Sequence, residues 1–368
     1  MKGKEEELDE KPLEKENFDI CGPHHLTSID WRLPEHRRSV AACMIQGVFV
    51  SERDRQEKRI KDDALAPIWW NFLHFDCFQI LVDPIDSSIF GIIYEYKHHI
   101  TNHFHPMSPQ SASPRYVIAF RGTVTRRETR KRDLHLDIKL AINGLTRDLR
   151  YQTACQAIQG IISKVGPNNV WLAGHSLGAA IALQAGKDMA KRGCYIETYL
   201  FNPPYLCVPI EKLSDPTLKN GVRIARSVLN AGLALAFNGT KISSTTHEQR
   251  DPFTTLSCWT PYLFLNPKDP ICCEYIGYFE HREKMEEWGV GRIERIATKS
   301  SAVSILSGAL GGDGEALHLI PSAFVTKNVI VKEQNFMAAH GLLQWWEPHP
   351  FWQSKHYQLN LLNLTKHN

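Results

Sequence analysis

The residues with the clearest chemical potential form the pentapeptide Gly174-His175-Ser176-Leu177-Gly178. An apolar run precedes it and a run of small residues follows, so we expect a strand, a sharp turn and a helix. This Gly-x-Ser-x-Gly context is typical of a serine held in a strained turn at the carboxyl edge of a parallel sheet. Gly174 and Gly178 are expected where a β-carbon would collide with the neighbouring strand or helix. We therefore predict that Ser176 is a nucleophile.

A serine nucleophile needs a base that takes its proton and an acid that orients the base. In this architecture the acid follows the serine along the chain, and the base follows the acid. Asp269 comes shortly after the strand-like run 262–265, between two prolines, whereas Asp215 and Asp251 have no such run before them. We predict that Asp269 is the acid.

The base is expected among the histidines that follow Asp269. His340 precedes an apolar segment near the C-terminus, and we expect it on a loop or helix start, free to turn toward Ser176. His318 lies in a strand-like run and His281 in a charged helix, where packing or solvated roles are the ordinary ones. We favour His340 and keep His318 and His281 as alternatives.

The oxyanion of an acyl-transfer reaction needs hydrogen-bond donors. The amide of Leu177 begins the expected helix, where backbone N–H groups have no helical partner. Thr123 ends the apolar run that begins at residue 116, and its backbone N–H, joined by its hydroxyl, is the expected second donor.

Composition narrows the possible classes. The 368 residues are 43% hydrophobic and 23% charged, with a formal net charge of +3. These values are typical of a soluble globular protein, and so small a charge gives no reason to expect nucleic acid as a partner. Runs of roughly 18 apolar residues, as in membrane-spanning helices, are absent from the sequence. The charged N-terminus is not a secretory signal, so we expect a cytoplasmic protein.

The cysteine and histidine patterns do not favour a metal site. The nine cysteines are scattered and form no Cys-x-x-Cys pair, which favours reduced thiols over a zinc site or a disulfide framework. Four histidines (His98, His99, His103 and His105) offer a metal site as an alternative, but the Pro and Ser residues among them favour an irregular loop. Serine chemistry requires neither a metal nor an organic cofactor, and we expect none.

Strand-like and helix-like runs alternate with short links, which predicts a doubly wound α/β fold with a mostly parallel sheet and helices on both faces. We expect a disordered charged tail over 1–20, one domain with an N-terminal helical extension over 21–350, and a C-terminal tail over 351–368. Helices are expected over 37–59, 68–82, 145–165, 177–191, 210–237, 278–288 and 336–346. Strands are expected over 88–96, 116–123, 134–140, 170–174, 197–201, 262–265 and, as the last, 317–327.

Several runs resemble a known family. Tyr-Val-Ile-Ala-Phe-Arg-Gly-Thr at 116–123, Val-Trp-Leu-Ala-Gly-His-Ser-Leu-Gly-Ala at 170–179, and Asn-Pro-Lys-Asp at 266–269 before a late histidine resemble the class 3, fungal-type lipases. Other stretches resemble a plant branch of that family whose members are often labelled GDSL esterase/lipase, although the sequence contains no Gly-Asp-Ser-Leu block.

This resemblance covers roughly residues 20–350 and implies the α/β-hydrolase fold. It implies nucleophile Ser176, acid Asp269, and oxyanion donors Thr123 and Leu177, with His340 in the place of the family's late histidine. It also implies a substrate class, the carboxylic esters of lipids.

We therefore predict a serine hydrolase that cleaves lipid esters through an acyl-enzyme. A basic segment, 124–133, stands where family lipases carry a lid; we expect a solvated loop there, with contact to a lipid surface as the functional alternative. The alternative for the whole protein is a lipase-like scaffold that binds lipid or protein partners without turnover.

Overall fold

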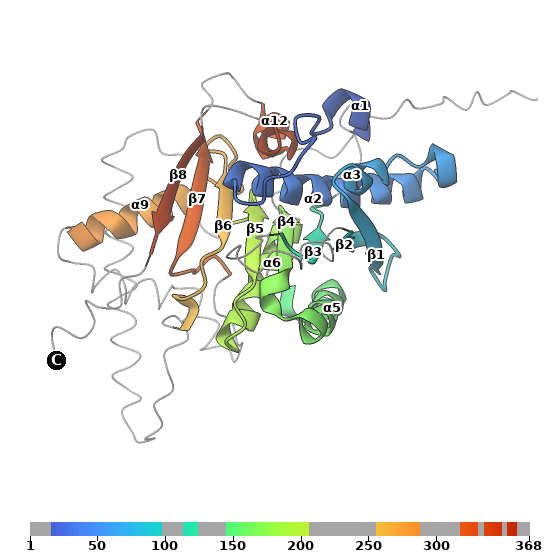
Figure 1. Ribbon diagram of the computed structural model, residues 1–368. Helices are drawn as coiled ribbons and strands as arrows, with labels where there is room; N and C mark the ends of the chain where they lie inside the picture. Colours follow the sequence, from blue (N-terminus) through green and yellow to red (C-terminus); the bar gives the residue numbers. More distant parts are fainter. Residues whose placement is uncertain are drawn as a thin grey trace, which may run out of the picture.

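The computed structural model of the chain describes residues 16–97, 113–123, 145–205, 255–287, 317–329, 335–347 and 352–358. Their strands form one mixed sheet in the order β1 to β8 (Figure 1). Strands β3 to β7 run parallel, β1 and β2 extend one edge antiparallel, and β8 closes the other edge antiparallel. The strand bounds are β1 Phe75–Val82, β2 Ile89–Tyr96, β3 Tyr116–Phe120, β4 Val170–His175, β5 Glu197–Phe201, β6 Tyr262–Leu265, β7 Ala323–Asn328 and β8 Trp352–Tyr357.

Helices cover both faces of this sheet (Figure 1). Side chains of α2 and α3 share one buried cluster, and those of α5, α6 and α9 share the cluster on the opposite face. The α-helices are α1 Phe18–Cys21, α2 Pro34–Gln56, α3 Ile68–Asn71, α5 Leu149–Val165, α6 Leu177–Lys191, α9 Glu274–Glu287 and α12 Phe336–His340. Short 3₁₀ turns are η2 Lys61–Asp63, η4 Leu145–Arg147, η5 Pro167–Asn169 and η7 Leu343–Trp345.

Alternation along the central strands explains the two clusters. In β4, Leu172 packs with α5 and α6, whereas its neighbours Trp171 and Ala173 pack with α2. Successive side chains of a strand point to opposite faces, so a strand that is buried on both sides is apolar throughout. Each buried leucine-sized side chain contributes about 1.5–3 kcal/mol relative to an exposed one. The sheet therefore separates two hydrophobic cores.

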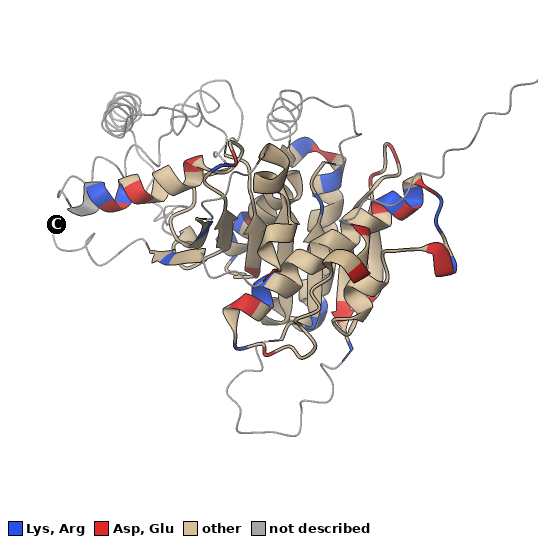
Figure 2. Cartoon of the chain, turned by 90° about the horizontal axis from the view of Figure 1, so that it is seen from above, with Lys and Arg blue, Asp and Glu red and all other residues tan. Residues whose placement is uncertain are grey.

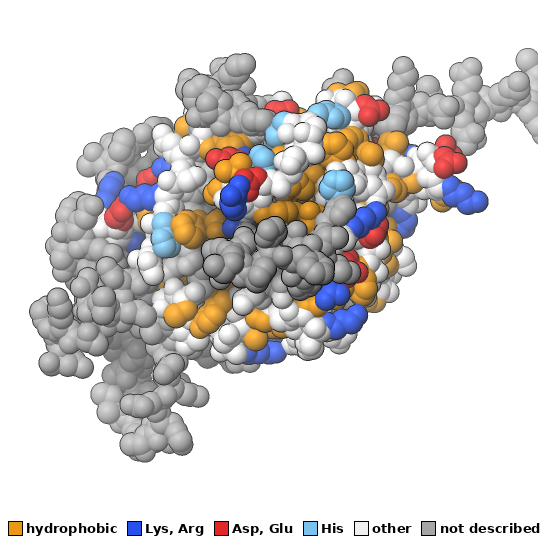
Figure 3. All heavy atoms as spheres, in the orientation of Figure 1, with side chains coloured by type: hydrophobic (Ala, Val, Ile, Leu, Met, Phe, Trp, Pro, Cys, Tyr) orange, Lys and Arg blue, Asp and Glu red, His pale blue; other side chains and the backbone are white. Residues whose placement is uncertain are grey.

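The outer surface carries most of the charge. Figure 2 shows Lys, Arg, Asp and Glu mainly around the periphery, with a centre formed largely by other residues. Apolar groups also reach the surface, where Figure 3 shows them interspersed with polar ones on the face drawn. In the edge strand β1, Phe78, Ile80 and Val82 are each at least 40% exposed.

Parallel strands bring their carboxyl ends to one edge of the sheet, where β3, β4, β5 and β6 all end. There β4 turns sharply at Ser176 into α6. This is the α/β-hydrolase fold that the sequence predicts, doubly wound around a mostly parallel sheet. Predicted helices 37–59, 145–165 and 278–288 are confirmed within a few residues as α2, η4 with α5, and α9.

The predicted helix 68–82 is wrong. Helix α3 ends at Asn71, and His74 adopts φ 62°, which a helix does not continue through. The rest of the segment is strand β1, paired antiparallel with β2. Its aromatic and branched side chains favour a strand, a preference that the predicted aromatic helix overlooked.

The predicted end of the domain is also wrong. Strand β8 begins at Trp352, inside the predicted tail 351–368, and pairs with β7 from Asn328 to Ala323. The predicted last strand is therefore the last but one, and it begins at Ala323 instead of residue 317. At the other end, α1 lies inside the predicted tail 1–20, and Phe18 packs edge-on against Trp69, with ring centroids 5.2 Å apart.

The predicted helix 336–346 consists of two separate elements, an α-helix and a 3₁₀ turn. Helix α12 ends at His340, Gly341 is extended with φ −65° and ψ 153°, and a 3₁₀ turn follows. His340 thus ends a helix, whereas a loop or helix start was predicted. The predicted strand 134–140, the predicted helices of 210–237, the basic segment 124–133 and the four-histidine stretch lie outside the described residues.

Candidate active site

Ser176 occupies the strained turn that the pentapeptide predicts. Its backbone has φ 53° and ψ −121°, an unusual conformation for a residue with a β-carbon. The glycines beside it permit close packing: a β-carbon on Gly174 would lie 2.3 Å from the Gly178 oxygen, and one on Gly178 would lie 2.4 Å from the oxygens of Phe120 and Arg121. Helix α6 therefore sits directly against β3 and β4, with the serine at their junction.

The Ser176 side chain is 2% exposed, and its Oγ has no hydrogen-bond partner in the described structure. Its backbone N–H donates to the Phe201 carbonyl over 3.0 Å, which ties the turn to β5. Leu177 is the first residue of α6, so its N–H has no partner within the helix. Attack by this hydroxyl on a carbonyl would form the oxyanion beside the helix N-terminus, where backbone N–H groups can stabilise it.

Asp269 and His340, 71 residues apart in the chain, lie side by side. Nδ1 of His340 is 2.8 Å from Oδ2 of Asp269, and the two residues are 8% and 0% exposed. An ionised carboxylate can only accept, so Nδ1 carries the proton and Nε2 of the neutral ring is left as an acceptor. The pair has the geometry of an acid that orients a base.

The charge of Asp269 is stabilised by its neighbours. Burial acts to raise the pKa of Asp269, but the positive charge that His340 carries when protonated and the hydrogen bonds from His340, Ile271 and Asn202 together outweigh it. The net effect lowers the pKa of Asp269 below its ordinary value. The Ile271 N–H donates to Oδ1 over 3.0 Å, so both carboxylate oxygens have partners. The acid is therefore ionised at neutral pH despite complete burial.

Asn202 is a site residue that the sequence reasoning missed. Its Nδ2 donates to Oδ2 of Asp269 over 2.6 Å and to the Ala339 carbonyl over 3.1 Å, while its Oδ1 accepts from Trp345 Nε1 over 2.8 Å. The residue directly follows β5, at the edge where β4 and β6 also end. An Asn immediately after a buried strand, before two prolines, is the signal that could have revealed it.

Gln344 holds the segment that carries His340. Its Nε2 donates to the carbonyls of Ala339 and Gly341, over 2.8 Å each. Its Oε1 accepts from Asn266 and Asn328, also over 2.8 Å each, near the ends of β6 and β7. The one amide in the apolar run 341–346 therefore joins the turn after α12 to two strand ends.

His175 connects the nucleophile turn to the same segment. Its Nε2 lies 2.7 Å from the carbonyl oxygen of His340, so this nitrogen donates, and the two ring centroids are 4.8 Å apart. Thr123 follows Gly122, whose backbone packs against Ser176, since a β-carbon on Gly122 would lie 2.9 Å from the serine Cβ. The residue that precedes the predicted oxyanion donor therefore packs against the predicted nucleophile.

The alternative bases have other surroundings. The ring of His318 packs on Tyr205, with centroids 4.2 Å apart, and His281 lies in α9. Asp215 and Asp251 are outside the described residues. Within the described ranges, no group of three or more His, Cys, Asp or Glu side chains is arranged to hold a metal ion. In the same ranges, the helices are too short or too polar to cross a bilayer.

Sequence comparison now identifies the family. No family model matches the chain. The chain is 48% identical over 352 residues to the GDSL esterase/lipase At4g10955 of Arabidopsis thaliana, covering 94% of this chain and 98% of that relative. This chain belongs to the same lipase/esterase family. The serine motif of the chain is nevertheless Gly-His-Ser-Leu-Gly, and the sequence has no Gly-Asp-Ser-Leu block.

Two solved structures are also similar in part. A crystal structure of the esterase EstE5 soaked with p-nitrophenyl butyrate aligns with a TM-score of 0.24 and 9% identity, over 66% of this chain and 85% of that one. The hyperthermophilic esterase of the archaeon Pyrobaculum calidifontis aligns with a TM-score of 0.25 and 12% identity, over 77% and 95% of the two chains. The strand order and the sharp turn at Ser176 define the fold of this chain.

Proposed function

We propose that this protein is a serine hydrolase that cleaves carboxylic esters of lipids, with Ser176, Asp269 and His340 as its catalytic triad. The observation that carries the proposal is the 2.8 Å contact between Asp269 and His340, at the sheet edge that also holds the strained Ser176. The 48% identity to a protein named as an esterase/lipase supports the same reaction class. The order Ser, Asp, His along the chain is the one used by α/β hydrolases.

In the proposed mechanism, Ser176 Oγ attacks the acyl carbonyl while its proton passes to Nε2 of His340. Asp269 holds the resulting imidazolium and stabilises its charge. The tetrahedral oxyanion accepts hydrogen bonds from the backbone N–H groups of Thr123 and Leu177. His340 then protonates the leaving alcohol, and the C–O bond to it breaks.

The second half of the cycle uses the same groups. Water gives a proton to His340 as its oxygen attacks the acyl-enzyme carbonyl, and the second oxyanion collapses by breaking the bond to Ser176 Oγ. The proton returns to the serine, and the carboxylic acid leaves. Residues of this chain therefore carry out each proton transfer and stabilise both the imidazolium and the oxyanion.

We further propose that the protein is of the class 3 lipase type. The support is the pair of motifs at 116–123 and 174–178, which lie beside each other where Gly122 packs on Ser176. Lipid esters are therefore the proposed substrates, and ester hydrolysis should be assayed in the presence of a lipid surface.

The test is labelling with a fluorophosphonate, which phosphonylates an activated serine, in native protein and in Ser176→Ala. We expect labelling of the native protein, none of the variant, and loss of ester hydrolysis in the variant with an unchanged circular dichroism spectrum. Labelling of Ser176→Ala would mean that another serine reacts. A well-folded native protein that is unlabelled both in buffer and with liposomes would instead support a binding scaffold.

A further inference from the structure

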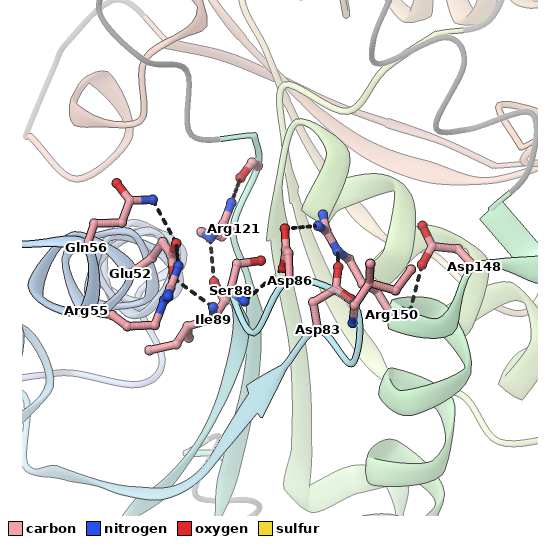
Figure 4. A network of polar contacts seen from close by, with 12 residues as sticks. Glu52, Arg55, Gln56, Asp83, Asp86, Ser88, Ile89, Arg121, Asp148 and Arg150 are labelled. Atoms are coloured by element: carbon pink, nitrogen blue, oxygen red, sulfur yellow. Dashed lines mark hydrogen bonds and ion pairs between the residues drawn. The ribbon is translucent and has the colours of Figure 1, made fainter.

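Arg121 is a buried arginine at the end of β3. The residue is 8% exposed, its Nε donates to the Ile89 carbonyl over 2.5 Å, and its Nη1 donates to the Gly122 carbonyl over 2.8 Å. Figure 4 shows this side chain between the strand end and the segment that begins β2. The guanidinium is thus bonded to two backbone carbonyls that lie far apart in the chain.

A buried charge needs compensation, and Glu52 of α2 provides part of it. Its carboxylate acts on the charge of Arg121 and accepts the Ile89 N–H over 2.8 Å. Ile89 is therefore held on both sides, its N–H by Glu52 and its carbonyl by Arg121 (Figure 4). Burial of a charged guanidinium costs free energy that burial of an apolar side chain does not. The contacts of the guanidinium therefore indicate the role of Arg121.

The hydrogen bond from Arg121 to the Gly122 carbonyl sets the direction in which the Thr123 N–H points. A peptide unit is planar and trans, so the carbonyl of Gly122 and the N–H of Thr123 point in opposite directions. Because Arg121 binds that carbonyl, the Thr123 N–H points away from the guanidinium. Gly122 itself packs on the nucleophile turn: a β-carbon there would lie 2.9 Å from Ser176 Cβ and 3.0 Å from the His175 oxygen.

Without that bond the peptide would be free to rotate. Glycine has no β-carbon and adopts both signs of φ readily, so the conformational preference of Gly122 itself does not oppose rotation of the 122–123 peptide. A rotated peptide would present the Gly122 oxygen, with its partial negative charge, where the Thr123 N–H had been. A hydrogen-bond donor to the oxyanion would be replaced by a repulsive acceptor.

We propose that Arg121 is a positioning residue that fixes the Gly122–Thr123 peptide with its N–H available to the oxyanion. The inference rests on the proposed function, because it concerns the donor side of the same reaction. Arg121, the arginine of the Phe-Arg-Gly-Thr run, would then affect the chemical step. It would act through Thr123, without contact with the substrate.

The test compares Arg121→Ala with Arg55→Ala. Arg55 pairs with the same Glu52 over 2.7 Å, but its side chain is 39% exposed, so its removal disturbs the network without removing the donor to Gly122. The readouts are kcat and KM for a soluble p-nitrophenyl ester, inhibition by a trifluoromethyl ketone that forms an oxyanion on the serine, and the melting temperature.

For Arg121→Ala we expect kcat to fall by about 10²-fold, the loss typical of one oxyanion donor, with KM nearly unchanged. The inhibition constant of the ketone should rise by a similar factor, because the ketone also depends on the donor. Guanidinium ion at millimolar concentration should restore part of kcat in Arg121→Ala. Arg55→Ala should keep the native values of all three kinetic constants.

Three outcomes would overturn the proposal: a folded Arg121→Ala with native kcat, a loss confined to KM, or a lower kcat with unchanged ketone inhibition. If Arg121→Ala does not fold, Arg121→Lys replaces it under the same criteria, since lysine keeps the charge but lacks the planar fork of donors that reaches both carbonyls. Native protein that neither hydrolyses esters nor reacts with fluorophosphonate would overturn the proposed function itself. Active, labelled native protein with an unaffected Arg121 variant would overturn only this inference.

Discussion

The side-chain amide of Asn202 lies 2.6 Å from Oδ2 of Asp269, and both residues are 0% exposed. The same oxygen faces Nδ1 of His340 over 2.8 Å, so two donors share one carboxylate oxygen. The amide also donates to the carbonyl of Ala339, directly before His340. Asn202 therefore fixes Asp269 and the segment that carries His340 relative to each other.

Replacement of Asn202 should weaken the proposed triad without removing any member of it. The residue has φ 47°, which glycine adopts without strain, so Asn202→Gly isolates the loss of the amide, while Asn202→Ala adds backbone strain. We expect Asn202→Gly to lower the free energy of unfolding by about 1–3 kcal/mol, because a buried carboxylate loses a donor. We expect kcat to fall about tenfold, with further loss of stability in Asn202→Ala.

Urea denaturation and steady-state ester hydrolysis would measure both effects. Removal of a donor should also raise the pKa of Asp269, since the amide is one of the groups that lower it. A native kcat in folded Asn202→Gly would mean that Asp269 and His340 keep their arrangement unaided.

The three candidate bases should respond differently to substitution. His340→Ala removes the ring that faces Asp269, and we expect kcat to fall by roughly 10⁴-fold or more, as in other triads. His318→Ala removes a ring that packs on Tyr205, and His281→Ala alters α9, so each should change stability more than kcat. Fluorophosphonate labelling rates of the three variants would serve as the check, and near-native labelling of His340→Ala would refute the assignment.

The backbone of Ser176 predicts a stability effect that is separate from activity. At φ 53° and ψ −121° a β-carbon is strained, and such strain costs about 1–3 kcal/mol. Ser176→Ala and Ser176→Gly both lack the Oγ, but only glycine relieves the strain. Thermal and urea unfolding should therefore show Ser176→Gly to be more stable than Ser176→Ala by about 1 kcal/mol, after its larger unfolded-state entropy is included. Equal stability of the two inactive variants would show that the turn stores no strain.

The sequence predicted the parts of the fold that follow from periodicity and glycine spacing. The strand, turn and helix around Ser176 are confirmed because Gly174 and Gly178 leave few alternatives to close packing. Asp269 was predicted from its position after an apolar run, and the structure puts it at the expected sheet edge. Predictions of this kind succeed where the residues of one short segment are enough to determine its conformation.

The errors and omissions come from contacts between distant segments. The segment 75–82 is apolar enough for a helix or a strand, and only pairing with β2 decides between them. Strand β8 depends in the same way on β7, which its own sequence does not reveal. The Asn-Pro-Pro signal after β5 marks Asn202 but not its partners Asp269, Ala339 and Trp345, which lie far along the chain. Gln344 likewise accepts from the distant Asn266, which its local sequence does not indicate. Long-range polar contacts are the part of the site that the sequence alone does not reveal.

The pH dependence of stability should report the Asp269–His340 pair. The pKa of Asp269 is lowered in the folded state, because the charge and hydrogen bonds around it outweigh the burial that opposes them. A lowered folded pKa stabilises the fold above the unfolded value of about 4, and that contribution is lost as pH falls through the folded value. Asp269→Asn has no such proton to bind.

Urea unfolding of the native protein and of Asp269→Asn at several pH values would test this. At pH 7 the native protein should be the more stable, and its advantage should shrink as pH falls below about 4. A difference between the two proteins that is constant from neutral pH to pH 3 would contradict the assignment of a lowered pKa. The variant should also lose most ester hydrolysis at every pH, since its amide has no negative charge to stabilise the imidazolium and can donate to Nδ1, which favours the wrong tautomer.

Gln344 provides a test of how firmly the base segment must be held. Its amide donates to the carbonyls on both sides of His340 and accepts from Asn266 and Asn328. Gln344→Glu keeps the acceptors but replaces the donor with a second oxygen, which would lie against the carbonyls of Ala339 and Gly341. Gln344→Ala removes both functions and leaves space for water. We therefore expect Gln344→Glu to be the more damaging substitution at neutral pH.

The expected loss in Gln344→Ala is about 1–3 kcal/mol of stability, because several buried or half-buried polar groups lose their partner. The effect on kcat should be larger in Gln344→Glu, and it should diminish at low pH, where a protonated glutamic acid regains one O–H donor. A pH series of kcat for the two variants, each divided by the native value at the same pH, isolates that recovery from the titration of the triad. Equal ratios for both variants at every pH would show that the carbonyls beside His340 do not need the amide.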